Sequence, residues 1–258
     1  MVIRIILIIF LASTAFAELC TTCHSEHYEK TGSCISCHRG DGRTSRKNIA
    51  HFGLITSSYA DFKINAEAVE KGRKITEKAS CRRCHLIGGK GNDLAPDLSA
   101  SAAKNTAEKL DKSISEPTDF MPKFYFTKTS RTSIIKYLLG TSVSETSKNP
   151  YAVYFTDSSE NVFDKKCGGC HRVITSGYGP SGIGDTAPNL SGLYSEFYPQ
   201  RKAIGKPWDK KILKEWMKNP RSHDKNTLMA PVPLTEKESE EIIRMLEIEK
   251  TVKEHSPF

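Results

Sequence analysis

The chain has 258 residues, which suits one or two domains, and its 26% charged and 9% aromatic residues exclude outright disorder. Its hydrophobic fraction is 38%. Counting Gly in place of Tyr raises this fraction to roughly 41%, against about 45 to 50% for a typical soluble domain. Side chains alone therefore supply little core. The formal net charge of +8 and the pI near 9.0 would suit a nucleic acid or an anionic membrane as partner.

The N-terminus has the organisation of a secretory signal peptide. Arg4 precedes an apolar run at 5–12, and the segment closes on a small-x-small cleavage site at 15–17. The run is too short to cross a bilayer, which takes about 20 apolar residues. We therefore expect residues 1–17 to be removed and the mature protein to be periplasmic or extracellular. An uncleaved membrane anchor is the alternative.

The eight cysteines fall into four Cys-x-x-Cys-His motifs, and none is left over. The motif residues are Cys20, Cys23 and His24; Cys34, Cys37 and His38; Cys81, Cys84 and His85; and Cys167, Cys170 and His171. Four disulfides or zinc sites would not require a His directly after each pair. By chance, one such motif should arise only about 0.01 times in a chain of this composition. The sequence therefore predicts four covalently bound haem c groups.

The chemistry of haem attachment explains the spacing. Two thiols three positions apart meet the two vinyl groups on one porphyrin edge and form thioethers, while the adjacent His ligates the iron. Four haems also bring about eight propionates, which offset most of the positive charge. We therefore expect no nucleic-acid partner. The basic runs at 39–47 and 201–214 are candidate docking faces for acidic redox proteins, or simply solvated surface.

The second axial ligands must come from the remaining His and Met residues. Residues 18–60 contain two motifs, no Met and two spare histidines, His27 and His51, so the sequence predicts two bis-His irons there. Because His27 follows His24 by only three positions, we expect His27 to serve the second haem and His51 the first, but this pairing is left open. Large apolar side chains are too few in this module for a core. The two haems would form it.

The remainder of the chain divides into two segments, 64–140 and 156–249, each with one motif and a helical plan. We expect helices over 67–79, 130–139, 161–167, 210–218 and from Thr235 onwards. The helix over 130–139 is expected to be amphipathic. At the start of the last helix, Glu238 completes a capping box.

Two loop methionines are the candidate second ligands of these segments. Met121 lies before a Pro, in a segment without a spare His, and Met229 lies in a Pro-rich loop. Met217 and Met245 lie inside helical stripes, where core packing is the expected role. His223, shortly before Met229, competes with it as a ligand.

Both segments resemble class I cytochrome c domains. In the second, the resemblance covers Phe163, the segment 188–190, the helix end at 216–220 and the Met229 loop. It implies all-α folds with His/Met ligation.

The resemblance also implies that a Pro carbonyl, at Pro96 and at Pro188, accepts a hydrogen bond from the haem-binding His. Two departures concern helix packing. Ser159 stands where the family has a Gly, and one extra residue separates Gly72 from Cys81.

Residues 18–60 resemble bis-His modules of multihaem cytochromes and, faintly over 49–55, cytochromes encoded in selenite and tellurite reduction operons. The expected protein is mainly α: a short haem-cored module with little regular structure, then two all-α cytochrome c folds. We expect a flexible linker at 141–155 and a frayed tail at 250–258.

Irons with two tight protein ligands exchange electrons and have no open position for a substrate. We therefore expect an exported tetrahaem electron carrier between redox proteins, a donor and an acceptor, rather than an enzyme. The alternatives are a dihaem peroxidase or reductase with one open iron, and a filament or conduit subunit. Association with a membrane complex and self-association stay open.

Overall fold

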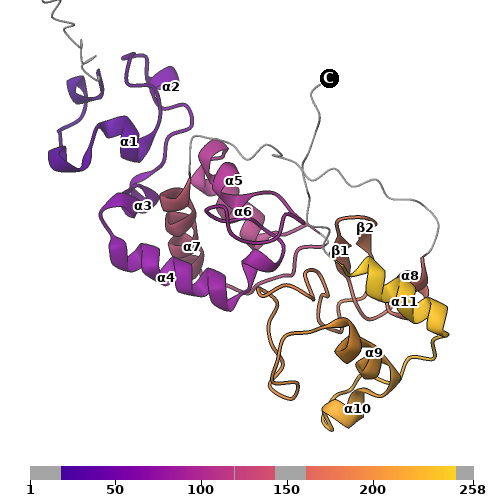
Figure 1. The fold of residues 1–258 in the computed structure, drawn as a ribbon. Helices are drawn as coiled ribbons and strands as arrows, with labels where there is room; N and C mark the ends of the chain where they lie inside the picture. The colour runs from indigo at the N-terminus through magenta and orange to yellow at the C-terminus, as the bar shows by residue number, and fades with distance from the viewer. Residues whose placement is uncertain (1–18, 119, 143–160, 248–258) are drawn as a thin grey trace, which may run out of the picture. The chain divides into compact units, whose positions relative to one another are not determined.

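The structure is a computed structural model, and it describes residues 19–118, 120–142 and 161–247 (Figure 1). The chain forms two compact units, one ending at Ala60 and the other beginning at Asp61. The expected signal peptide, most of the linker and the tail lie outside the described residues. Among the described helices, none is both long and apolar enough to cross a membrane. The fold is mainly α, as the sequence predicts.

The first unit consists of short helical turns joined by loops. Its elements are η1 (Leu19–Thr22), η2 (Glu29–Thr31), α1 (Cys34–His38), α2 (Lys47–Ala50) and α3 (Ser57–Ala60). Its described part buries three hydrophobic residues, Ile55, Tyr59 and Ala60, whereas Phe52 is 84% and Tyr28 63% exposed. Side chains alone do not build a core here, in keeping with the low apolar content of the segment.

The second unit begins with a helical domain, which we call the middle domain. Its elements are η3 (Asp61–Lys63), α4 (Ala66–Lys78), η4 (Cys81–Arg83), α5 (Leu98–Lys104), α6 (Ala107–Ser115) and α7 (Lys128–Thr141). α4 lies along α7, and α5 and α6 also pack on α7 (Figure 1). The helices expected over 67–79 and 130–139 are confirmed as α4 and α7. The sequence analysis did not predict α5 and α6.

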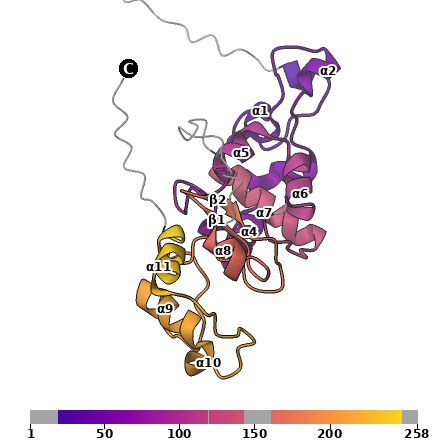
Figure 2. The same cartoon turned by 90° about the vertical axis from the view of Figure 1, so that its right-hand side faces the viewer.

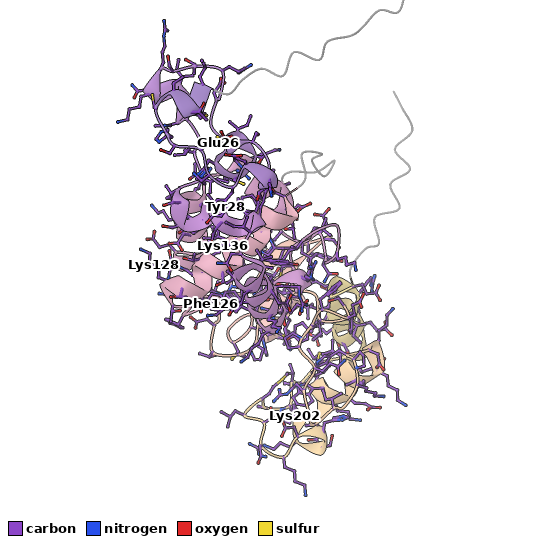
Figure 3. The ribbon with its side chains drawn as sticks, turned by 90° about the vertical axis from the view of Figure 1, so that its left-hand side faces the viewer. Glu26, Tyr28, Phe126, Lys128, Lys136 and Lys202 are labelled. Carbon is purple, nitrogen blue, oxygen red and sulfur yellow. The ribbon has the colours of Figure 1, made fainter. Side chains whose placement is uncertain are left out.

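The expected amphipathic character of α7 is wrong. All seven residues at 133–139 are buried, because α4, α5, α6 and η3 pack around the helix. The charged residue in this stretch, Lys136, lies within the helix (Figure 3), and its Nζ donates to Asp61 Oδ2 at 2.9 Å. This ion pair compensates the burial of the Lys136 charge.

Gly72 allows α4 and α7 to meet. A Cβ atom at Gly72 would lie 1.9 Å from the carbonyl oxygen of Ser133 on α7, so no larger residue fits at this distance. One turn further on, the Thr76 hydroxyl donates to the Gly72 carbonyl at 2.7 Å and is itself buried. The extra residue between Gly72 and Cys81 therefore does not prevent close helix packing.

The rest of the second unit, residues 161–247, is a further helical domain, which we call the C-terminal domain. Its elements are α8 (Val162–Lys166), β1 (Val173–Thr175), β2 (Gly179–Ser181), α9 (Lys210–Lys218), α10 (Pro220–His223) and α11 (Glu236–Met245). β1 and β2 form an antiparallel hairpin, which the sequence analysis did not predict. The helix over 210–218 is confirmed as α9, and the capping box of Thr235 and Glu238 starts α11.

The core of the C-terminal domain is built from α8, α9 and α11. α9 lies against α11 (Figure 2). α8 also contacts α11, and its Phe163 is fully buried in the core cluster that includes Ile242 and Ile243. Met217 and Met245 are each 3% exposed and belong to this core. Their expected packing role is confirmed.

Replacing Gly72 tests the contact between α4 and α7. Gly72→Ala should lower the free energy of unfolding of the haem-loaded protein by about 1–3 kcal/mol, because the added methyl group overlaps the Ser133 carbonyl. Urea unfolding followed by circular dichroism measures this change. Gly140→Ala is the matched control, since its Cβ would meet Val69 no closer than 3.9 Å. Equal losses from both substitutions would contradict the contact.

Candidate functional site

Each Cys-x-x-Cys-His motif folds into one helical turn. The backbone N–H groups of His24, His85 and His171 donate to the carbonyl of the first Cys in their motifs, at 3.0, 3.0 and 2.9 Å, and the second motif is the helix α1. A turn of this kind gathers two thiols three positions apart and the following imidazole at one place. All eight cysteines lie within the described residues, and none of them forms a disulfide.

Two of the motif histidines are oriented by proline carbonyls. His85 Nδ1 lies 2.7 Å from the Pro96 carbonyl oxygen, and His171 Nδ1 lies 2.7 Å from that of Pro188, which confirms both hydrogen bonds that the resemblance implies. Because a carbonyl can only accept, Nδ1 carries the proton and Nε2 keeps the lone pair that an iron requires. Burial also lowers the pKa of His85, which favours the neutral ring.

The second motif uses the same device with a different residue. His38 Nδ1 donates to the Ile55 carbonyl at 3.1 Å, and the Ile55 N–H donates to the His38 carbonyl at 2.7 Å. The Ile55 side chain is fully buried. The sequence does not indicate this role for Ile55, because no Pro-containing segment like those around Pro96 and Pro188 marks its carbonyl.

The histidines of the first unit meet as two pairs of imidazole rings. The ring centroids of His24 and His51 are 5.9 Å apart, and those of His27 and His38 are 5.8 Å apart. A metal bound about 2 Å from a nitrogen of each ring would hold the two centroids about 6 Å apart. Each pair therefore has the spacing that an iron between the rings requires. The pairs match the expected assignment, in which His27 serves the second haem and His51 the first; the ligation itself stays a prediction.

In the C-terminal domain, Met229 is fixed by a tryptophan. Trp216 Nε1 donates to the Met229 sulfur at 3.0 Å, and Trp216 is itself buried in the core. This contact has no counterpart in the sequence pattern, because it joins a helix residue to a loop residue. His223, the competing ligand, lies with Nε2 3.6 Å from a Glu215 carboxylate oxygen.

In the middle domain, the half-buried Met121 lines a cavity of about 670 Å³. The cavity is bounded on one side by residues of the middle domain between 115 and 125, and on the other by Arg172, Gly184, Asp185, Ala187 and Asn189 of the C-terminal domain. His85 does not line it. The structure therefore gives no contact that joins Met121 to His85.

Two buried donors in the C-terminal domain suit a haem. Tyr194 Oη and Trp208 Nε1 are buried and lack a hydrogen-bond partner within the described residues, and burial raises the pKa of Tyr194 above its ordinary value. Buried donors of this kind normally bind an acceptor. The propionate carboxylates of a haem are acceptors, so the residues present fit the group. The same domain supplies Cys167, Cys170 and His171 to attach it.

Two family models match the chain. The model described as "Cytochrome C oxidase, cbb3-type, subunit III" matches residues 67–138, and the model described as "Cytochrome c" matches residues 158–247.

Two regions of the chain are thus similar to cytochrome c domains. Such domains bind haem covalently and transfer electrons, so the matches support a c-type cytochrome. The two matches leave residues 18–60 uncovered. No curated protein and no solved structure matches the chain.

The ring pairs in the first unit predict which His serves which haem. In a Cys34→Ser/Cys37→Ser variant, which lacks the second attachment site, His51→Ala should convert the remaining N-terminal haem from low spin to high spin, because His51 faces His24. His27→Ala in the same background is the matched control and should leave that haem low-spin. Electron paramagnetic resonance (EPR) at low temperature distinguishes the two states. The opposite result would reverse the pairing.

Proposed function

We propose that the protein is an exported tetrahaem c-type cytochrome that passes electrons from one redox protein to another. The observation that carries this proposal is the spacing of the two imidazole pairs, His24 with His51 and His27 with His38, at 5.9 and 5.8 Å. A haem held between two such ligands supplies one-electron exchange and offers no open position to a substrate. The N-terminal module would thus serve electron transfer alone.

The cytochrome c domains would differ from the N-terminal module in potential. A Met in the second axial position raises the potential of a haem relative to two His ligands. In the C-terminal domain this role falls to Met229, which Trp216 holds at 3.0 Å, and in the middle domain to Met121. The protein would therefore carry two low-potential haems near the N-terminus and two high-potential haems in the rest of the chain.

The basic face of α9 is the candidate docking surface for a redox partner. Lys210 and Lys214 form ion pairs within the domain, with Glu247 and Glu236, so their charges are partly neutralised. Lys211 and Lys218 are exposed on the same helix and would attract an acidic protein. The match of the middle domain to a subunit of cbb3-type oxidase suggests a membrane complex as one class of partner.

A dihaem peroxidase or a reductase is the second candidate, and the surroundings of Met121 favour it. Met121 lines a cavity that His85 does not line. If Met121 does not bind the iron of the middle domain, that iron has an open position for a substrate. Export and the number of four haems belong to the proposal for the carrier and for the enzyme alike.

Low-temperature EPR with a redox titration of the exported protein tests the proposal. We expect four low-spin haems, two with bis-His and two with His/Met signatures, and a mass that exceeds the apoprotein mass by four haem groups. A high-spin haem that binds peroxide or an oxyanion would refute the carrier and support the enzyme.

Substituting methionines tests the ligand in the C-terminal domain. Met229→Leu should abolish the near-infrared sulfur-to-iron band of one haem and lower its potential, because the thioether ligand is lost. Met217→Leu is the matched control: Met217 is buried in the core, so the band should stay and stability should fall by less than about 1.5 kcal/mol. A Met229→Leu protein with both bands intact would exclude Met229 as a ligand.

A further inference from the structure

The segment 188–192 of the C-terminal domain connects its own haem-binding His to the middle domain. Pro188 accepts the hydrogen bond of His171 at 2.7 Å. The next residue, Asn189, contacts the middle domain twice. Its backbone carbonyl accepts from Arg83 Nη1 at 3.2 Å, and its side-chain Nδ2 donates to the Phe120 carbonyl at 3.2 Å. Phe120 directly precedes Met121.

Arg83 lies inside the third haem motif, between its two cysteines. The Arg83 guanidinium lies over the ring of Tyr198 at 5.7 Å from its centroid, and Tyr198 Oη donates to the Asn189 carbonyl at 3.0 Å. One carbonyl thus accepts from a residue of each domain. Both Arg83 and Tyr198 are half-buried, a setting in which cation–π and charge-assisted contacts are stronger than in open water.

The backbones of the two domains also approach closely at this point. A Cβ atom on Gly192 would lie 2.4 Å from the Arg83 carbonyl oxygen, so only a Gly permits the contact. Ile174 of the C-terminal domain packs against the buried cluster of Cys84, Leu94 and Ala95 in the middle domain. Hydrogen bonds, apolar packing and a close backbone approach therefore all join the two domains around the third Cys-x-x-Cys-His motif.

We propose that Arg83 and Asn189 form a clamp that holds the two cytochrome c domains together as one rigid pair. The clamp links the loop that orients His171 to the haem motif of the middle domain, and it anchors the Met121 loop through the Phe120 carbonyl. The functional consequence rests on the proposed function: an electron exchanged between the two domains crosses a fixed separation and needs no diffusional encounter. The clamp itself depends only on the contacts.

The neighbouring Arg82 provides a matched control. Arg82 occupies the same motif, but its guanidinium donates to Ile87, Lys90 and Tyr137 within the middle domain. Its loss should weaken the middle domain and leave the contact between the domains intact.

Hydrogen exchange and calorimetry of the haem-loaded, full-length protein test the clamp. In Arg83→Gln, the protection of amides at 190–193 and at 120–121 should fall about tenfold. In Asn189→Ala the readout is 120–121, because Asn189 Oδ1 itself accepts from the Ser191 N–H. In both variants the joint unfolding transition of the two domains should split into two. Arg82→Gln should lower protection at 87–90 and leave the joint transition single. Arg83→Lys, which keeps the charge but not the planar fork, should recover the joint transition in part.

Unchanged protection at 120–121 in both clamp variants would overturn the proposal. If Arg83→Gln interferes with haem attachment, Asn189→Ala still tests the clamp, because Asn189 lies outside every Cys-x-x-Cys-His motif. EPR spectra of the same samples report the axial ligands separately. In the unsubstituted protein, missing ligand signatures together with a joint unfolding transition would count against the proposed function. Separate unfolding of the two domains in that protein would count against the clamp.

Discussion

In each of the four motifs, a single helical turn brings two thiols and an imidazole to one place, and the rest of the structure depends on this turn. In three motifs a backbone carbonyl from elsewhere in the chain then binds Nδ1 of the imidazole, at 2.7 Å for His85 and His171 and at 3.1 Å for His38. The proton on Nδ1 leaves Nε2 free to bind a metal. The surrounding fold therefore has to deliver one carbonyl to each of these rings.

The chain delivers that carbonyl in two different settings. In the second unit, Pro96 and Pro188 supply it, within domains whose helices pack closely, as α4 does against α7 at Gly72. In the first unit, Ile55 does the same from a segment with very little side-chain core. There, the covalent haems would provide the apolar volume that side chains do not. Segment 24–27 contributes one ring to each imidazole pair, so the two haem sites would share this segment.

The carbonyl-bearing loop also has a second use in the C-terminal domain. Pro188 orients His171, while the adjacent Asn189 binds Arg83 and Phe120 of the middle domain. A loop required for haem ligation in one domain thus becomes the contact surface for the other.

The sequence by itself determined the four Cys-x-x-Cys-His motifs that predict haem attachment, because covalent attachment demands a fixed local spacing of Cys and His that needs no tertiary structure to be recognised. It also predicted α4, α7, α9 and the capping box of α11, since helical periodicity and caps are local properties. Helices α5 and α6, the hairpin and the burial of all residues at 133–139 of α7 were missed, because neighbours distant in sequence produce them.

The tertiary structure alone decided which carbonyl binds His38, how Trp216 reaches Met229 and how Arg83 reaches Asn189, and it chose between the histidine pairings that the sequence left open. Each of these contacts joins groups that are far apart in the chain or that lie in the backbone, so no sequence pattern encodes them.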